Sequence, residues 1–423
     1  MSRFTEGGQH LRINCVLPLS AASLAGVAVF GWGLLTGNSL RVWQAYHVNL
    51  IFWLGLCLGS VALVAIFNLT NAGWARPLKR LAEAPACALP VLWLAFWGLY
   101  FGRDALFPWA REPVHGKELW LSAASLFPRD GFTLAILVVL CLALVYQSVR
   151  DDREFLGIRG GNRGFKREPG RRWKAQKVLS FCLATGYGLG MTLLAWDLIM
   201  SLDPHWVSTL FGAYYFLGSI YTAVGALILL GIIFHRQEGF CGALGPRQFH
   251  DLGKLLMAFC LVTGDFFYSQ FLVIWYGNIP EETKYVILRV KTMPWQAMAW
   301  IVMVMSFGVP FLALLSRKLK MVPALLGPVA LLALLGMWLE RMLLVAPSVW
   351  SEAFVPLGWV ELGVSLGFLG VVGLATRWFL LRVPPLPISD PLFRERFPQA
   401  GEFSWGTLQG RSQGLTSSGG GHV

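Results

Sequence analysis

Residues 47–69 read HVNLIFWLGLCLGSVALVAIFNL, and this run of 23 residues contains no Asp, Glu, Lys or Arg. A helix of that length is long enough to cross the hydrocarbon core of a bilayer, which is about 30 Å thick. Nine further stretches of comparable length and composition occur along the chain. The sequence therefore predicts an all-α integral membrane protein with ten transmembrane helices.

The ten predicted spans fill most of the chain. They cover residues 16–35, 47–69, 84–101, 131–149, 178–200, 211–234, 252–275, 295–316, 322–344 and 359–376. Together they form a transmembrane domain at residues 16–377, between an N-terminal segment at residues 1–15 and a tail at residues 378–423. The tail begins with several prolines and ends in Ser and Gly, which is typical of an extended segment with a disordered end.

The composition of the chain excludes a soluble domain. Hydrophobic residues make up 56% of the 423 residues and charged residues only 14%, whereas soluble domains are about 45–50% apolar and about 25% charged. The net charge of +12 does not indicate nucleic-acid binding, because in a membrane protein the surplus of lysine and arginine normally lies in cytoplasmic loops.

The distribution of basic residues predicts the orientation in the membrane. Of the 35 lysine and arginine residues, 25 fall in the two termini and the even-numbered loops, and ten of these lie in the loop at residues 150–177. Both termini are therefore expected in the cytoplasm of a bacterial inner membrane. The basic loop is interpreted as a solvated segment that touches anionic headgroups, with docking of a cytoplasmic partner as the alternative.

Cysteine and histidine give no sign of a redox centre in this chain. None of the seven cysteines belongs to a C-x-x-C pattern, although haem c or an iron–sulfur cluster would need clustered cysteines. The histidines lie at the margins of the spans or outside them, whereas two-histidine ligation of haem b needs imidazoles well inside facing helices. We therefore expect no metal site, no bound redox cofactor and no catalytic residue in this chain.

The fifth span carries an acidic residue and ends in a polar turn. Asp197 shares a helical face with Gly186 and Gly190, and small residues at this spacing let another helix approach closely, so Asp197 is expected to point into the bundle. Asp203 and His205 follow at the end of the span, where a carboxylate beside an imidazole could accept a proton from a quinol. The alternative is structural, with Asp203 capping the next helix and His205 bonding within a tight turn.

The seventh span carries a second group of polar residues. Lys254 and Asp265 are eleven residues apart, about three helical turns, so they share a face with Tyr268 and Ser269. Such a stripe suits a proton half-channel that starts in the cytoplasm. The alternative is an Asp265 carboxyl group that hydrogen-bonds to a neighbouring helix and only locks the two helices together.

Four other ionisable residues are expected to form ion pairs. Arg103 is adjacent to Asp104 after the third span, and Glu340 is adjacent to Arg341 in the ninth. Each pair lies toward the periplasmic end of its helix. Mutual neutralisation lowers the cost of a charge near lipid, so ion pairing is the simplest interpretation of all four.

Two blocks of the chain resemble a known family. The first reads WDLIMSLDPHW at residues 196–206 and continues with STLFG at 208–212 and YYF at 214–216. The second reads HDLGKLL at residues 250–256 and continues through SQF at 269–271 to WYGNIPEET at 275–283. Both are similar to the ActF subunits (quinone-binding subunit 2 of quinol:cytochrome c oxidoreductase) of bacterial alternative complex III, which are related to the NrfD and polysulfide-reductase membrane subunits. The resemblance covers residues 192–283, and Asp265 departs from the family pattern within it.

The resemblance implies two four-helix bundles, spans two to five and six to nine, flanked by spans one and ten. It implies partner subunits, an NrfD-like membrane protein, a multihaem cytochrome c and an iron–sulfur protein, that oxidise quinol and reduce cytochrome c or another periplasmic acceptor. This chain would support assembly, and its polar residues would translocate protons or bind quinol. The expected proton carriers are Asp203 and His205 at the periplasmic surface, Asp197 and Asp265 inside, and Lys254 at the cytoplasmic side.

The periplasmic loop with Asn278, Glu281 and Glu282 is expected to contact a partner subunit. Two other functions remain open. Ten spans with few buried charges also suit a secondary transporter, although no pair of Gly- or Pro-broken spans occupies matching positions in the two halves. A membrane-embedded transferase would need a loop rich in carboxylates, histidines or metal ligands, and the longest loop is instead basic. Neighbouring genes for multihaem cytochrome and iron–sulfur subunits would distinguish the three.

Overall fold

The computed structural model of the chain describes residues 15–155, 172–237, 240, 243–350, 352 and 354–397. Of these residues 83% are helical, and none of them lies in a strand. Ten helices are long and apolar enough to cross a membrane, which confirms the predicted all-α membrane fold. Most of the N-terminal segment, the centre of the basic loop and the end of the tail lie outside the described residues.

The spanning helices match the predicted spans and are mostly longer. They are α1 (Val16–Leu35), α2 (Ser39–Leu69), α4 (Leu89–Leu106), α6 (Ala123–Phe155), α7 (Trp173–Leu198), α8 (Phe211–Phe234), α9 (Pro246–Gly277), α11 (Trp295–Met303) continued by η5 (Val304–Gly308) and α12 (Val309–Leu314), α14 (Pro323–Val349) and α15 (Trp359–Arg382).

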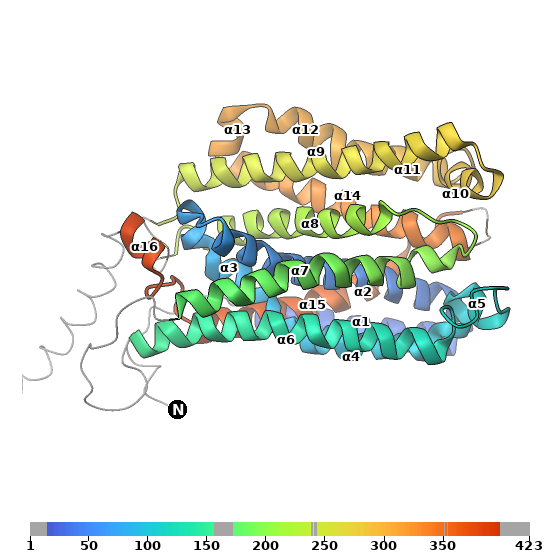
Figure 1. Cartoon of the computed structure of the whole chain (residues 1–423), viewed down its shortest axis with the longest axis horizontal. Coiled ribbons are helices and arrows are strands. Elements are labelled where there is room, and N and C mark those ends of the chain that lie inside the picture. Colours follow the sequence, from blue (N-terminus) through green and yellow to red (C-terminus); the bar gives the residue numbers. More distant parts are fainter. Residues whose placement is uncertain are drawn as a thin grey trace, which may run out of the picture.

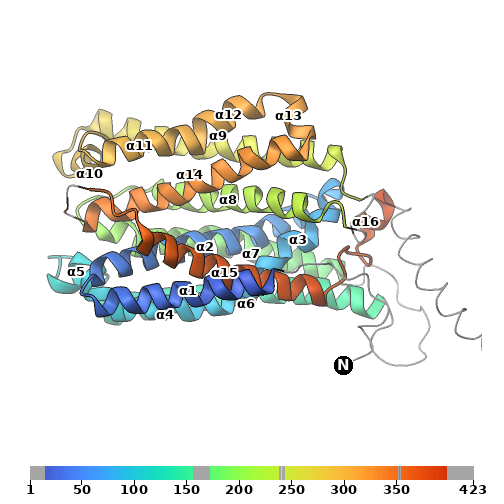
Figure 2. The ribbon, with the colours of Figure 1, turned by 180° about the vertical axis from the view of Figure 1, so that it is seen from behind.

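These helices form two four-helix bundles and a flanking pair (Figures 1 and 2). The first bundle contains α2, α4, α6 and α7, and the second contains α8, α9, α11 with α12, and α14. α2 also packs against α8 and α14 and thereby joins the two bundles. α1 and α15 lie side by side against the first bundle. Spans one and ten, at opposite ends of the sequence, are therefore neighbours in space.

Glycines set the closest contacts between helices. Gly55 and Gly59 of α2 face Ser219 of α8, and an added Cβ would lie 2.6 and 2.7 Å from atoms of that serine. Gly26 of α1 and Gly367 of α15 face each other, and a Cβ on Gly26 would lie 2.3 Å from the Cα of Gly367. Larger side chains at these positions would force the helices apart.

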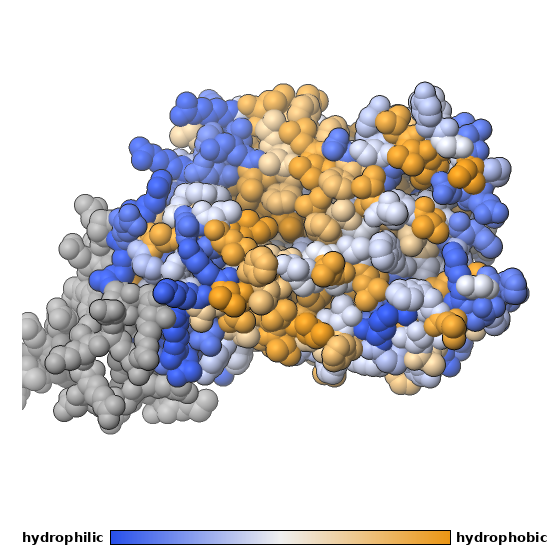
Figure 3. Space-filling model, viewed as in Figure 1, coloured by the Kyte–Doolittle hydropathy of each residue, from blue (hydrophilic) through white to orange (hydrophobic). Residues whose placement is uncertain are grey.

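Short helices mark the two ends of the membrane domain. α5 (Pro108–Arg111) and α10 (Pro280–Val290) lie at one end, called the α10 end, and α13 (Arg317–Met321) and α16 (Pro391–Arg396) lie at the other, called the α16 end (Figure 1). On the face drawn in Figure 3, a mostly hydrophobic band separates two hydrophilic ends. A bilayer imposes this pattern on a protein that crosses it.

The segment between α2 and α4 differs from the prediction. The sequence predicted a loop at residues 70–83, but η1 (Gly73–Leu78), α3 (Lys79–Glu83) and η2 (Ala84–Ala88) lead as helical turns into α4. The three cations of this segment were expected in a solvent-exposed cytoplasmic loop. Only 1–2% of each is exposed in Arg76, Lys79 and Arg80. Their charges lie inside the protein, because carboxylates from other parts of the chain reach them there.

Candidate functional site

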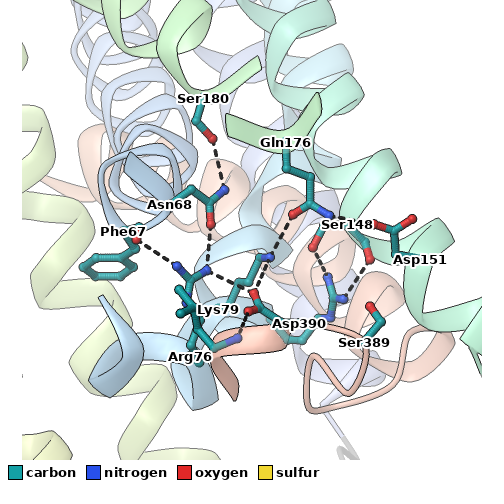
Figure 4. A network of polar contacts seen from close by, with 12 residues as sticks. Phe67, Asn68, Arg76, Lys79, Ser148, Asp151, Gln176, Ser180, Ser389 and Asp390 are labelled. Atoms are coloured by element: carbon teal, nitrogen blue, oxygen red, sulfur yellow. Dashed lines mark hydrogen bonds and ion pairs between the residues drawn. The ribbon is translucent and has the colours of Figure 1, made fainter. Parts of the chain in front are cut away.

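A network of buried polar side chains closes the α16 end of the first bundle (Figure 4). It connects α2, η1, α3, α6 and α7 to the segment before α16. Its members, called the α16-end network, are Asn68, Arg76, Lys79, Arg80, Glu83, Ser148, Asp151, Asp152, Gln176, Ser180, Ser389 and Asp390.

Asp390 is the centre of one half of this network. One of its carboxylate oxygens accepts hydrogen bonds from Nη1 of Arg76 and Nζ of Lys79, each 3.1 Å away. Arg76 also donates to the side chain of Asn68 at 2.7 Å and to the carbonyl of Phe67 at 2.9 Å. That carbonyl is among the last in α2, which have no partner within the helix, so Arg76 caps α2 while it holds the tail.

Arg80 is the centre of the other half. Its guanidinium forms ion pairs with both Glu83 and Asp152 and donates to the hydroxyl and the carbonyl oxygen of Ser148 at 3.0 and 3.1 Å. Asp152 in turn accepts from the backbone amide and the hydroxyl of Ser389 at 2.8 and 2.6 Å. Across both halves, three cations face three carboxylates that are at most 5% exposed, so their charges balance.

The segment before α16 is therefore packed on the bundle. Asp390 accepts a bond from the amide of Leu392 at 3.1 Å and so caps α16, in which Pro391 is the first residue. Burial acts to raise the pKa of Asp390, but the charges of Lys79 and Arg76 outweigh burial and hold that pKa below its ordinary value. The sequence indicated an extended segment here and gave no sign that it docks.

Asp197 lies in a second cluster, at the α10 end of the first bundle. It is fully buried and accepts from Nε1 of Trp120 at 2.9 Å. Its other oxygen accepts from Nε and Nη2 of Arg129 at 2.9 and 2.7 Å. The Arg129 guanidinium also lies 3.8 Å from the centroid of the Trp120 ring. Asp197 thus points into the bundle, as its helical face predicted.

Asp130 adjoins this ion pair and was missed by the sequence analysis. Its carboxyl group lies beside that of Asp197 and is 0% exposed, yet no N–H group or hydroxyl among the described residues donates a hydrogen bond to either of its oxygens. Asp130, Asp197 and Arg129, called the Asp197 cluster, therefore combine two carboxyl groups with one guanidinium. Arg129 and Asp130 come directly before the predicted fourth span, and their position at the same end as Asp197 was the signal available.

Both predicted ion pairs are present, in different surroundings. Glu340 and Arg341 are 2.9 Å apart and are only 4% and 1% exposed inside the second bundle. Arg341 lies 4.3 Å from the ring centroid of Tyr215 and donates to the carbonyl of that residue at 3.3 Å. Arg103 and Asp104 are 3.5 Å apart at the surface, where the Asp104 side chain is 68% exposed.

The polar turn after α7 does not form the expected acid–base pair. Asp203 is half-buried, His205 is exposed, and no contact joins their side chains among the described residues. The cap residue of α8 is Leu210, so Asp203 does not cap that helix either. Its charge acts instead on Tyr285 and Arg289 of α10. The contacts predicted by the acid–base interpretation and by the helix-capping interpretation are therefore both absent from this turn, as far as the described residues show.

Arg289 is a buried anchor that the sequence analysis missed. It donates to the carbonyls of Leu343 and Leu344 in α14 at 3.1 and 2.8 Å. The Leu343 carbonyl needs an outside partner because Pro347, four residues later, has no amide hydrogen. Burial lowers the pKa of Arg289, and burial raises the pKa of Tyr285, whose ring lies 3.4 Å from the guanidinium, to about 12. These contacts fix α10 to the second bundle.

The polar stripe of α9 faces outward. Lys254, Asp265 and Tyr268 are exposed and Ser269 is half-buried, so the residues share a face, and that face points out of the chain; the half-channel stays a prediction. Lys254 pairs with Asp251 at 2.6 Å. The opposite face packs inward because it carries the apolar and small residues, including Leu252, Gly253, Leu256, Cys260 and Thr263.

The residues expected to contact a partner lie at the α10 end. Asn278 follows α9 with a φ of 44° in the left-handed region and is exposed. Glu281 and Glu282 lie in the first turn of α10, where Glu281 is exposed and Glu282 is half-buried. A partner contact requires this accessibility.

α2 contains two more buried polar side chains. Gln44 is 2% and His47 is 0% exposed, and no described residue bonds to the side-chain polar atoms of either. A cavity of about 10 Å³, lined by Gln44, Asn49, Trp338 and Glu361 among others, adjoins Gln44. This volume is comparable to the space that one water molecule occupies and is far too small for a quinone ring.

Among the described residues, no three His, Cys, Asp or Glu side chains gather as a metal site would require. No protein-family model matches the chain, and no curated protein matches it either. Its function is therefore inferred from the buried charges and from the two sequence blocks.

Proposed function

We propose that the chain is a membrane subunit of a quinol-oxidising respiratory complex similar to alternative complex III, and that its Asp197 cluster exchanges protons. Partner subunits with haem c and iron–sulfur clusters would carry the electrons to cytochrome c or another periplasmic acceptor. The α10 end would face the periplasm of a bacterial inner membrane, and the α16 end would face the cytoplasm. Support comes from the two ActF-like blocks, the first of which contains Asp197.

The observation that carries the proposal is the charge imbalance of the Asp197 cluster. Arg129 neutralises one carboxylate, and the adjoining Asp130 has no partner of its own among the described residues. A second ionised carboxylate at a buried site would be uncompensated and costly. We infer that the two carboxyl groups hold one proton between them, which is the property needed for a site that takes up and releases a proton.

The Asp197 cluster is also placed where a proton could reach it. The Arg129 side chain is 20% exposed, while Asp197 is fully buried, so the guanidinium lies between the carboxyl groups and the surface at the α10 end. Asp265 and Lys254, which face outward, are not part of this proposal.

The subunit assignment is tested by purification from the native membrane in mild detergent. We expect chains with haem c and iron–sulfur clusters to co-purify, to be identified by mass spectrometry, and to give haem c bands in a reduced-minus-oxidised spectrum. A lone, colourless protein would reject the respiratory assignment and make a secondary transporter the leading alternative.

The proton role is tested in the purified complex after reconstitution into liposomes. We expect Asp130→Asn to leave quinol oxidation running while it lowers the number of protons moved per electron. Asp104→Asn is the matched control, because it removes an exposed carboxylate at the same end of the protein. An unchanged proton-to-electron ratio in Asp130→Asn would contradict the proposed role.

A further inference from the structure

α9 carries a carboxylate on its outer face, halfway along the part that crosses the membrane. Lys254 lies eleven residues before Asp265 and Trp275 lies ten residues after it, which is about 16 and about 15 Å along the helix axis. Lysine and tryptophan at such positions typically mark the two interfaces of a bilayer, whose hydrocarbon core is about 30 Å thick. Asp265 therefore lies near the bilayer midplane.

The Asp265 carboxyl group has no partner within the described part of the chain. The residue is exposed, and neither the Tyr268 hydroxyl nor the Ser269 hydroxyl, about one turn along the same face, bonds to it. Lys254, the cation on this face, already pairs with Asp251 at 2.6 Å. The aspartate side chain is too short to reach either interface, so lipid alone would leave a polar group unsatisfied.

The exposed face of α1 provides a comparison, because it has the composition expected of a surface that contacts lipid. Both helices are mostly unburied, with 11% of the apolar window of α1 and 17% of that of α9 inside the protein. α1 contains no ionisable residue between Val16 and Leu35, and its side chains at mid-depth, Leu24 and Val27, are each 71% exposed. The outer face of α9 has the polar side chains of Asp265 and Tyr268 at the same depth, whereas contact with lipid favours apolar side chains there.

We infer that this face of α9 packs against a transmembrane helix of another polypeptide, and that the helix places a Lys or Arg side chain opposite Asp265. The face comprises Lys254, Ala258, Leu261, Asp265, Tyr268 and Leu272. A cation is the complement that satisfies a carboxylate where no water is available.

A second copy of this chain fits the face less well. A two-fold contact through this surface would bring two Asp265 carboxyl groups together and would supply no cation at that depth, since Lys254 lies about 16 Å away along the helix. A different polypeptide is therefore the better match.

This inference goes beyond the proposed function, because it holds whichever complex supplies the partner. Purification without haem or iron–sulfur chains would reject the respiratory assignment and leave the α9 surface untouched. Conversely, a haem-containing complex in which the α9 face meets only lipid would overturn this inference alone.

The test is photo-crosslinking in the native membrane. A photoreactive amino acid replaces Leu261, which lies one turn from Asp265 and is 40% exposed, and the same amino acid replaces Leu24 of α1 as the matched lipid-facing control. We expect the Leu261 probe to form an adduct with one transmembrane helix that has a Lys or Arg near its centre. Peptide mapping by mass spectrometry identifies that helix, and the Leu24 probe should label lipid.

Two variants connect the adduct to the carboxylate. Asp265→Leu should reduce the adduct at least tenfold, and replacing Asp265 by Lys together with the partner cation by Asp should restore it. The thermal midpoint of the purified Asp265→Leu chain should not fall, because an apolar side chain suits an exposed position in lipid, and this separates lost pairing from misfolding. Labelling of lipid alone, an adduct between two copies of the chain, a partner helix without a central cation, or an adduct unaffected by Asp265→Leu would each overturn the inference.

Discussion

The two buried charge clusters of the first bundle differ in their balance. Among the buried members of the α16-end network, three cations meet three carboxylates, and Arg80 alone pairs with both Glu83 and Asp152. The fourth carboxylate, Asp151, is half-buried and pairs with Arg172. In the Asp197 cluster, one guanidinium meets two carboxyl groups, and Asp130 has no ion pair and no hydrogen-bond donor among the described residues. The buried charges of the α16-end network compensate one another without an added proton. The Asp197 cluster is compensated only when one of its carboxyl groups is protonated.

This difference indicates that the two ends of the first bundle have different functions. A balanced buried network resists any change in charge, because the loss of one member leaves its partner uncompensated. An unbalanced cluster can change its protonation at smaller cost. We therefore regard the α16-end network as a structural closure and the Asp197 cluster as the site where charge can change.

The strongest test of this contrast is the replacement of Arg80 by Leu. The change would leave the buried Glu83 and Asp152 carboxylates without their shared cation, and we expect a loss of about 3–5 kcal/mol of unfolding free energy. Thermal or chemical unfolding of the purified protein in detergent measures it. Leu81→Ala, a buried apolar change in the same helix, is the control for packing. A change for Arg80→Leu within the error of the measurement would show that the network does not stabilise this end.

The second test releases the tail. Asp390→Asn removes the carboxylate that holds Arg76 and Lys79, so we expect a loss of about 2–4 kcal/mol and proteolysis between α15 and α16 at neutral pH. Ser389→Ala, which loses one hydroxyl contact with Asp152 but keeps the charges, is the milder comparison. Equal protection of both variants from protease would contradict the role assigned to the carboxylate.

The wild-type tail should respond to acid in a defined direction. The pKa of Asp390 is lower in the folded protein than the ordinary value of a carboxyl group, so its stabilisation is complete above that ordinary value and is lost as the pH falls through the lowered one. We expect the tail to stay protected from neutral pH down to about pH 5 and to be released only below about pH 4. Release between pH 5 and pH 7 would contradict this pairing.

The fold was largely predictable because the bilayer leaves few choices. Runs such as residues 211–234 are mostly apolar and contain no charge, and a stretch of that length can only be a spanning or a deeply buried helix. The predicted and observed bounds coincide for α1 and α8. The prediction was wrong at residues 73–83, where the gap between two apolar spans indicated a loop. The cations there are buried because their partners Asp152 and Asp390 come from distant parts of the chain.

The sites were less predictable because the helical period shows which residues share a face but not which way that face points. The shared face of Gly186, Gly190 and Asp197 predicted an inward aspartate correctly, since the small residues marked the contact side. The shared face of Lys254 and Asp265 lacked such a marker, and it points outward. Asp130 lay just outside a predicted span, so its burial depended on helix packing that the sequence does not encode locally.

The carboxyl groups of the Asp197 cluster should respond unequally. Asp197→Asn removes the ion-pair partner of Arg129, so we expect a loss of about 2 kcal/mol. Asp130→Asn keeps the shape of the group and supplies an amide that can donate to Asp197 in place of the shared proton, so we expect a change of less than about 1 kcal/mol. Unfolding of both variants under the same conditions gives the two losses of unfolding free energy and their ratio. Equal losses would mean that Asp130 has a compensating partner and that the cluster is balanced.

The smallest effect is expected at the exposed pair of Arg103 and Asp104. The two charges are 3.5 Å apart, but the Asp104 side chain is 68% exposed, so water already solvates it. Arg103→Ala should therefore change the unfolding free energy by less than about 0.5 kcal/mol. The pair lies at the same end as the Asp197 cluster and has the same two chemical groups, so it isolates burial as the variable. A large loss of unfolding free energy in Arg103→Ala would mean that an ion pair stabilises strongly even at an exposed site. Burial would then not explain the difference between the two clusters.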